Sequence, residues 1–217
     1  MTDQAALVQI SEKLRAGDNF AVIDLVKKAL AAGIAPKTIL DEGMIAGMTI
    51  VGEQFRDNLI FLPEVLIAAR AMHAGLDILK PELIAGKVPS RGKVILGTVK
   101  GDLHDIGKNL VAIMLQGAGY DVIDLGTNVP PDRFIDTALG EGIRIIGMSA
   151  LLTTTMVGMK QVIDLINSRG LLNQLKTVVG GAPLTARFAE EIGANGYARN
   201  AVEAVKLIGD LQESASE

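Results

Sequence analysis

The chain has 217 residues, of which 49% are hydrophobic and 21% are charged, so it can bury a large core and does not have the composition of a disordered protein. Its formal net charge is −4 and it has no basic run, which argues against nucleic acid as the main partner. Cysteine is absent, which excludes disulfides, thiolate catalysis and cysteine metal sites.

The beginning of the chain lacks the features of a secretory signal. Residues 1–4 provide neither a basic start nor an apolar run. No later stretch is apolar for long enough to cross a bilayer. We therefore expect a cytoplasmic protein that works without a membrane.

The first eighty-odd residues have apolar residues at helical spacing. The pattern predicts four amphipathic helices, the second beginning at Asp18 or Asn19, the third near Pro36 and the fourth near Pro63. Short connections between amphipathic helices favour a four-helix bundle. Residues 80–91 contain prolines and glycines and are expected to form the linker that follows the bundle.

The connection between the third and fourth predicted helices is unusually apolar. The segment from Phe55 to Pro63 places two of the five phenylalanines and three aliphatic residues in a turn region. These side chains either close the end of the bundle or form an apolar lid over a bound ligand. The sequence leaves both interpretations open.

After residue 91 the pattern changes to strands alternating with helices. Strands are predicted at 93–99, 120–125, 143–149, 176–180 and 195–198. Helices are predicted at 106–118, 131–140, 154–169, 184–193 and 200–212. This alternation predicts a five-stranded parallel sheet with helices on both faces, in the flavodoxin-like order 2-1-3-4-5.

Three polar or glycine-rich loops should meet at one edge of this sheet. In the predicted order the carboxyl ends of strands one, three and four lie side by side, and ligands bind at that edge in open α/β sheets. The loops are residues 101–109, with an imidazole, two carboxylates and two glycines, then 149–155, with four hydroxyls, and 180–183, with two glycines. The convergence predicts a binding site there.

Asp102 and His104 are two residues apart in a loop that we expect to be extended, so their side chains can point the same way. A carboxylate bound to one ring nitrogen fixes the tautomer and leaves the other nitrogen to bind a metal or move a proton. The following hydroxyls can donate to amides or phosphate, or cap the next helix. A surface histidine, helix caps and a glycine turn remain the ordinary explanations for the same residues.

Two common nucleotide signatures do not fit the first of these loops. A phosphate-binding P-loop has four residues between its glycines, whereas five separate Gly101 from Gly107, and Asn109 replaces the expected Ser or Thr. No GxGxxG follows the first strand, which argues against a nicotinamide cofactor.

The combination Asp102-x-His104-x-x-Gly107, Ser149-x-Leu151 and Gly180-Gly181 resembles, in order and spacing, the DxHxxG–SxL–GG signature of cobalamin-binding domains. The resemblance extends over nearly the whole chain. It is closest to the small stand-alone corrinoid proteins of methyltransferase systems, which resemble the cobalamin module of methionine synthase. It implies a helical cap domain at 1–88 and a cobalamin-binding, Rossmann-like domain at 89–217.

The resemblance also implies residue roles. His104 would be the lower axial ligand to cobalt, Asp102 would bond its far nitrogen, and Thr155 would complete a proton relay where the family often has serine. The remaining cofactor residues would be Phe55 and Leu62 over the upper face, Ser149, Leu151, Thr153, Gly180 and Gly181 around the nucleotide tail, and Gly101, Leu103, Asp105, Ile106, Gly107, Tyr197, Asn200 and Ala201. Asn58 stands where relatives often have glycine, and asparagine tolerates a positive φ, so the turn should persist.

The function implied is that of a methyl carrier. A cobalamin or related corrinoid would alternate between methylcobalamin and cob(I)alamin, with the protein as the non-catalytic subunit. A substrate-specific methyltransferase would load the methyl group, and a second methyltransferase would pass it to a thiol or folate acceptor. A reductive activase would be a further partner.

Two other functions share this core. One is a cobalamin-dependent sensor or regulator, although such proteins carry an additional DNA-binding module. The other is the small subunit of an adenosylcobalamin mutase, which needs a radical-generating partner. The methyl donor, whether methanol, a methylamine, a betaine or an aryl methyl ether, stays open because donor choice belongs to the partner enzyme.

Overall fold

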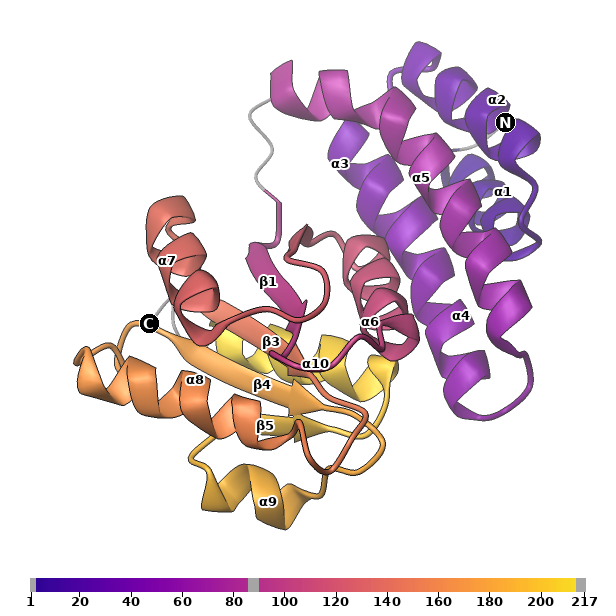
Figure 1. Cartoon of the computed structure of the whole chain (residues 1–217). Helices are drawn as coiled ribbons and strands as arrows, with labels where there is room; N and C mark the ends of the chain where they lie inside the picture. The colour runs from indigo at the N-terminus through magenta and orange to yellow at the C-terminus, as the bar shows by residue number, and fades with distance from the viewer. Residues whose placement is uncertain (1–2, 86–89, 214–217) are drawn as a thin grey trace. The chain divides into compact units, whose positions relative to one another are not determined.

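The structure, a computed structural model, describes residues 3–85 and 90–213 and consists of two compact units (Figure 1). One is helical and holds the described residues up to Arg91 together with Gln116–Gly119. The other is built around a sheet and holds the rest. The expected domain boundary at 88/89 lies outside the described residues and stays a prediction. In the described ranges no helix is both long and apolar enough to cross a membrane.

The helical unit contains the four helices that the sequence predicts. Its segments are α1 (Asp3–Arg15), α2 (Asn19–Ala31), α3 (Pro36–Thr38), η1 (Ile39–Ile45), α4 (Ala46–Arg56) and α5 (Leu62–Ala85). Asp18 caps α2, as expected, by accepting a hydrogen bond of 3.1 Å from the backbone N–H of Ala21. Fully buried Ile10, Leu14, Met44 and Met72 form part of its core.

The third predicted helix corresponds to three segments, α3, the π-helical segment η1 and α4, which follow one another without a break. Two glycines face α1 along it. A Cβ on Gly43 would lie 3.3 Å from the side chain of Ile10, and one on Gly47 would lie 3.2 Å from that of Ser11. These glycines therefore allow the third helix to pack closely against α1.

The fourth helix runs further than expected. Residues 80–85 were expected to belong to the linker, but α5 continues through Pro81 to Ala85. A proline lacks the N–H that would bond one turn back, so it weakens a helix by one hydrogen bond without having to end it. Leu79, fully buried just before it, keeps this part of the helix packed. Residues 86–89 of the expected linker lie outside the described residues.

The sheet unit confirms the predicted topology. Its strands are β1 (Lys93–Thr98), β2 (Asp121–Asp124), β3 (Ile145–Ser149), β4 (Lys176–Gly180) and β5 (Gly196–Ala198), all parallel and in the order β2-β1-β3-β4-β5. Its helices are α6 (Ile106–Gly117), α7 (Pro131–Glu141), α8 (Val157–Ser168), α9 (Ala186–Glu191) and α10 (Ala201–Glu213). In Figure 1, α7 and α8 lie on one face of the sheet, where an apolar core cluster joins them to the strands.

The register of the sheet aligns the strand ends. Thr98 pairs with Ser149, Ser149 with Gly180, and Gly180 with Ala198. This row crosses the sheet near the carboxyl ends of four strands. The loops that follow therefore begin level with one another, which is the convergence that the sequence predicts.

Helix α8 begins at Val157, later than expected, because residues 153–156 form turns. Helix α7 begins at Pro131, as predicted, with a proline in its first turn. Gly142 follows α7 with a φ of 64°, the left-handed conformation that suits a glycine after a helix.

Candidate functional site

The loop between β1 and α6 brings a carboxylate and an imidazole together. One carboxylate oxygen of Asp102, Oδ1, accepts a hydrogen bond of 3.0 Å from the backbone N–H of His104 and lies 2.7 Å from its ring nitrogen Nδ1. The predicted contact between the two side chains is confirmed. The same oxygen accepts from the backbone and the ring of His104, so the carboxylate fixes this short stretch of the loop locally.

The second oxygen of Asp102 binds the loop after β3. Oδ2 accepts bonds of 2.8 Å and 3.3 Å from the backbone N–H groups of Leu151 and Leu152, and lies 2.6 Å from the hydroxyl oxygen of Thr155. The side chain of Asp102 is fully buried. One carboxylate therefore joins two of the three loops that were predicted to converge.

Asp102 is held in its ionised form. Burial by itself raises the pKa of this carboxyl, but the bonds donated by the hydroxyl of Thr155, the backbone of Leu151 and the backbone and ring of His104 outweigh it and hold the pKa well below its ordinary value. An ionised carboxylate can only accept hydrogen bonds. In the neutral imidazole of His104, Nδ1 therefore carries the proton and Nε2 keeps its lone pair.

The hydroxyl of Thr155 does not cap a helix. It lies within hydrogen-bond distance of Asp102 Oδ2 and, at 3.0 Å, of the carbonyl oxygen of Leu152. A hydroxyl has one proton, and the shorter contact with the charged oxygen favours donation to Asp102. The cap residue of α8 is Met156, which makes no side-chain cap bond. The capping explanation therefore does not account for Thr155.

The third loop packs its backbone against the second. A Cβ on Gly181 would lie 1.9 Å from the carbonyl oxygen of Ala150, and one on Gly180 would lie 3.1 Å from that of Ala198. Gly181 also has a φ of 140°, which a side chain rarely allows. The glycine pair thus permits close approach between neighbouring loops. Its predicted place beside a nucleotide tail stays a prediction.

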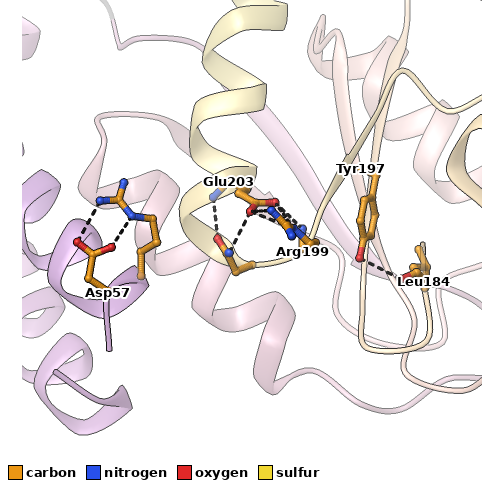
Figure 2. Close-up of polar contacts among 7 residues, drawn as sticks. Asp57, Leu184, Tyr197, Arg199 and Glu203 are labelled. Carbon is orange, nitrogen blue, oxygen red and sulfur yellow. Dashed lines mark hydrogen bonds and ion pairs between the residues drawn. The ribbon is translucent and has the colours of Figure 1, made fainter. Parts of the chain in front are cut away.

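The last predicted residues lie in β5 and around the start of α10. The hydroxyl of Tyr197 donates a bond of 2.9 Å to the carbonyl of Leu184, which ties β5 to the chain after β4 (Figure 2). The side-chain oxygen of Asn200 accepts a bond of 2.9 Å from the backbone of Glu203 in the first turn of α10. Ala201 is the buried first residue of that helix. These contacts are structural, and a role at a cofactor stays a prediction for all three predicted residues.

Apolar side chains lie exposed next to His104, whose own side chain is 51% exposed. Leu103 and Ile106 are 73% and 75% exposed, and Leu151 is 43% exposed. Of the other predicted residues in these loops, Gly101, Gly107 and Thr153 are exposed, and Asp105 and Ser149 are partly buried. Large apolar side chains that stay exposed around a polar group favour a binding surface for a ligand with a large apolar face.

Phe55 and Leu62 belong to the helical unit, where they are partly buried at the end of α4 and the start of α5. Between them, Leu59 and Phe61 are 71% and 67% exposed, so these two do not close the end of a bundle. Asn58 has the expected positive φ, at 57°. The place of Phe55 and Leu62 at a cofactor stays a prediction.

Two residues that support the His104 loop were not identified from the sequence. Thr98, fully buried, donates a bond of 2.9 Å to the carbonyl oxygen of His104. Asn128, between β2 and α7, accepts a bond of 2.8 Å from the backbone N–H of Gly101. Asn128 could have been found from its type, because asparagine before a helix-starting proline pair suggests a turn with a positive φ.

A buried amine lies on the first turn of α6, one residue after the loop's second glycine. Lys108, 4% exposed, forms an ion pair with Asp124 at the end of β2, and its Nζ donates a bond of 2.8 Å to the side chain of Asn109. Pairing of this kind is what allows a lysine to be buried. It joins the start of α6 to the edge strand.

The ligand set suits a metal that is already held by another group. Within the described residues, no three or more His, Cys, Asp or Glu side chains are grouped so that they could hold a metal ion by themselves. A single imidazole with its far nitrogen bound to a carboxylate is the kind of axial ligand that a macrocyclic metal centre needs. His104 fits that requirement.

Comparisons with known proteins found two matching family models and several similar chains. Two family models, both described as B12 binding domain, match residues 92–206 and 7–80. Trimethylamine corrinoid protein 1 of Methanosarcina mazei is 43% identical over 88% of this chain and 89% of its own. Dimethylamine corrinoid protein 2 of the same organism is 42% identical over 97% of this chain and 98% of its own.

Solved structures are similar as well. The crystal structure of the methanol:cobalamin methyltransferase complex MtaBC from Methanosarcina barkeri contains a chain that matches with a TM-score of 0.85 and 29% identity, over 96% of this chain and 80% of that one. A cobalamin-binding protein from Desulfitobacterium hafniense matches with a TM-score of 0.78 and 32% identity, over 94% of this chain and 97% of that one.

Proposed function

The chain belongs to the family of proteins with a B12 binding domain, and we propose that it carries a methyl group on a corrinoid within a methyltransferase system. The observation on which the proposal depends most is the half-exposed imidazole of His104, held in one tautomer by a buried, ionised Asp102. The similar chains named corrinoid proteins support it.

His104 would hold the cofactor from below through Nε2, the nitrogen that the bond to Asp102 leaves unprotonated. A bound corrinoid supplies a cobalt centre that accepts a methyl group and releases it as a cation equivalent. Leu103 and Ile106, exposed in the loop that carries His104, would pack against the apolar ring.

Asp102 would control how strongly His104 binds. A hydrogen bond from Nδ1–H to a carboxylate raises the basicity of the other ring nitrogen, so the ionised Asp102 makes His104 a stronger ligand. The hydroxyl of Thr155, at 2.6 Å from Asp102, holds a further proton next to the same carboxylate. These residues hold protons at defined atoms and do not themselves react.

The nucleotide tail of the cofactor would lie along the carboxyl edge of the sheet, beside the loops after β3 and β4. Ser149, Leu151, Thr153 and the glycine pair would line it, with Tyr197, Asn200 and Ala201 towards its end. Phe55 and Leu62 would shield the methyl-bearing face, and such a cover must move to admit a partner.

The partners proposed are two methyltransferases and a reductive activase. Similarity to a chain of the MtaBC complex supports a methyltransferase as the partner that loads the methyl group. A second methyltransferase, with a thiol or folate acceptor, would unload it. The similar proteins carry the names of trimethylamine and dimethylamine corrinoid proteins and of a methanol:cobalamin methyltransferase complex, which supports the proposal that the partner enzyme sets the donor.

The test is reconstitution of the apoprotein with hydroxocobalamin. We expect His104→Ala to change the visible spectrum of the bound cofactor and to lower its retention during gel filtration, because cobalt loses its nitrogen ligand. His73→Ala, at an exposed position on α5, is the matched control and should retain the parent's spectrum. A parent and a His104→Ala protein with the same spectrum and retention would contradict the assignment.

A further inference from the structure

The loop between β2 and α7 reaches the loop that carries His104, although the sequence pointed only to loops after other strands. Pairing between β1 and β2 continues past the strand ends, because Thr98 donates to the carbonyl of Gly126 at 2.9 Å and accepts from the N–H of Val129 at 2.9 Å. Asn128 stands between these residues with a φ of 54°. In this left-handed conformation its side chain meets Gly101 and its backbone N–H meets Asp102.

Asn128 holds this segment at both ends. Its side-chain Oδ1 accepts the N–H of Gly101 at 2.8 Å, and its own N–H donates to the carbonyl oxygen of Asp102 at 2.9 Å. We call these two bonds the Asn128 bracket. The two bonds lie on either side of the Asp102 backbone, and the carboxylate of Asp102 must reach both His104 and the loop after β3.

We propose that Asn128 is a positioning residue for His104, acting through the backbone of Asp102. The bracket fixes the backbone position from which the Asp102 side chain extends. One carboxylate oxygen then contacts Nδ1 of His104, and the other contacts the hydroxyl of Thr155. The consequence at cobalt rests on the proposed function. The consequence for the tautomer of His104 does not, because it is a property of the apoprotein.

Position 128 has two requirements, a positive φ and a side-chain oxygen that accepts a hydrogen bond, and different substitutions can test them separately. A positive φ is tolerated by glycine and, among residues with a side chain, best by asparagine and aspartate. Only the latter two also provide a side-chain oxygen that can accept the N–H of Gly101. Asn128→Gly therefore keeps the backbone conformation and removes the side-chain bond to Gly101, whereas Asn128→Asp keeps the conformation and both bonds of the bracket.

The first measurement uses the apoprotein. The chain has two histidines, so a His73→Gln background leaves His104 as the single imidazole. Nitrogen NMR at mildly alkaline pH should show the parent imidazole with its proton on Nδ1. We expect Asn128→Gly to populate the other tautomer as well, and Asn128→Asp to retain the parent's spectrum.

The second measurement uses protein loaded with cob(II)alamin. Histidine labelled with nitrogen-15 changes the nitrogen splitting of the electron paramagnetic resonance signal only where His104 is bound to cobalt. We expect Asn128→Gly to lower the ratio of ligated to unligated cofactor about three- to tenfold, the effect of one lost hydrogen bond. If the parent itself shows no isotope effect, the ligand assignment under the proposed function fails, while the tautomer measurement still decides the role of Asn128.

Asn195 provides a matched control at the opposite end of the sheet. Its Oδ1 accepts the N–H of Thr177 at 2.8 Å, and its own N–H donates to the carbonyl of Thr177 at 3.0 Å, near the start of β4. Asn195→Gly removes an equivalent bond far from His104 and should change neither the tautomer nor the ligation. The inference is overturned if Asn128→Gly behaves as the parent in both measurements, or if Asn195→Gly changes them as much.

Discussion

At the scale of single residues, the site depends on Asp102. A buried charge is costly unless hydrogen bonds replace its water, and within the described part of the chain both oxygens of this carboxylate accept such bonds. The donors come from His104 on one side and from Leu151, Leu152 and Thr155 on the other. The same bonds that stabilise the charge also orient the imidazole, so stability and function share one set of contacts.

This arrangement predicts a pH dependence of stability. The pKa of Asp102 is lower in the folded than in the unfolded chain, where it is about 3.9, so its contribution is complete above that value and is lost as the pH falls towards the folded pKa. Asp102→Asn should destabilise the apoprotein by about 1–3 kcal/mol at neutral pH. The difference from the parent should stay constant down to about pH 5 and shrink below about pH 4.

Urea unfolding of the two apoproteins across this pH range measures the difference directly. A gap that already closes between neutral pH and about pH 6 would assign the dependence to another group, since a carboxylate with a lowered pKa does not titrate there.

At the scale of elements, the loops after β3 and β4 are packed backbone to backbone. Gly181 lies against Ala150, the residue that precedes the two N–H donors to Asp102. The loop after β4 therefore supports the carboxylate without touching it. A family signature that contains two glycines here is explained, at least at Gly181, by this lack of space for a Cβ.

We expect Gly181→Ala to destabilise the protein by about 2–5 kcal/mol, through overlap with Ala150 and a φ unsuited to alanine. Gly170 is the control, because it has a φ of 70° with nothing within 4 Å of an added Cβ. Gly170→Ala should cost only about 1–2 kcal/mol, the backbone strain alone. If both variants lost the same amount of unfolding free energy in thermal or urea unfolding, the close contact with Ala150 would contribute nothing to stability.

At the scale of the whole molecule, the strands of the sheet unit differ in whether they are paired on one side or on both. β1, β3 and β4 are each paired on both sides, whereas β2 and β5 are at the edges and β5 has only three residues. The row from Thr98 to Gly180 thus lies on the most protected strands. The His104 loop leaves from β1, near the middle of the sheet, which gives the candidate ligand a rigid base.

Hydrogen exchange should show this grading. Amide protons of β1 and β3 should exchange slowest, and those of β5 should exchange faster, because edge strands and short strands open without disrupting the rest. Mass spectrometry of peptides from the intact apoprotein measures this. Protection in β5 equal to that in β3 would mean that the unit opens only as a whole.

The sequence alone determined the sheet, its strand order and the contact between Asp102 and His104. The apolar periods of strands and helices are local properties of the sequence. Polar residues that directly follow a strand can also be placed from the sequence, because parallel strands end at the same edge of the sheet. The left-handed conformation of Asn58 was predictable for the same local reason. The extension of α5 past Pro81 was not, because burial of the neighbouring turn decides whether a proline ends a helix.

Only the tertiary structure decided how the His104 loop is held. Asn128 is 27 positions from Gly101, and Leu151 is 49 positions from Asp102. Which groups meet across such separations depends on strand register and on where each loop turns back, and no local pattern encodes either. The residue types that form the site are therefore readable from the chain, whereas the bonds that aim His104 exist only once the loops are assembled on the sheet.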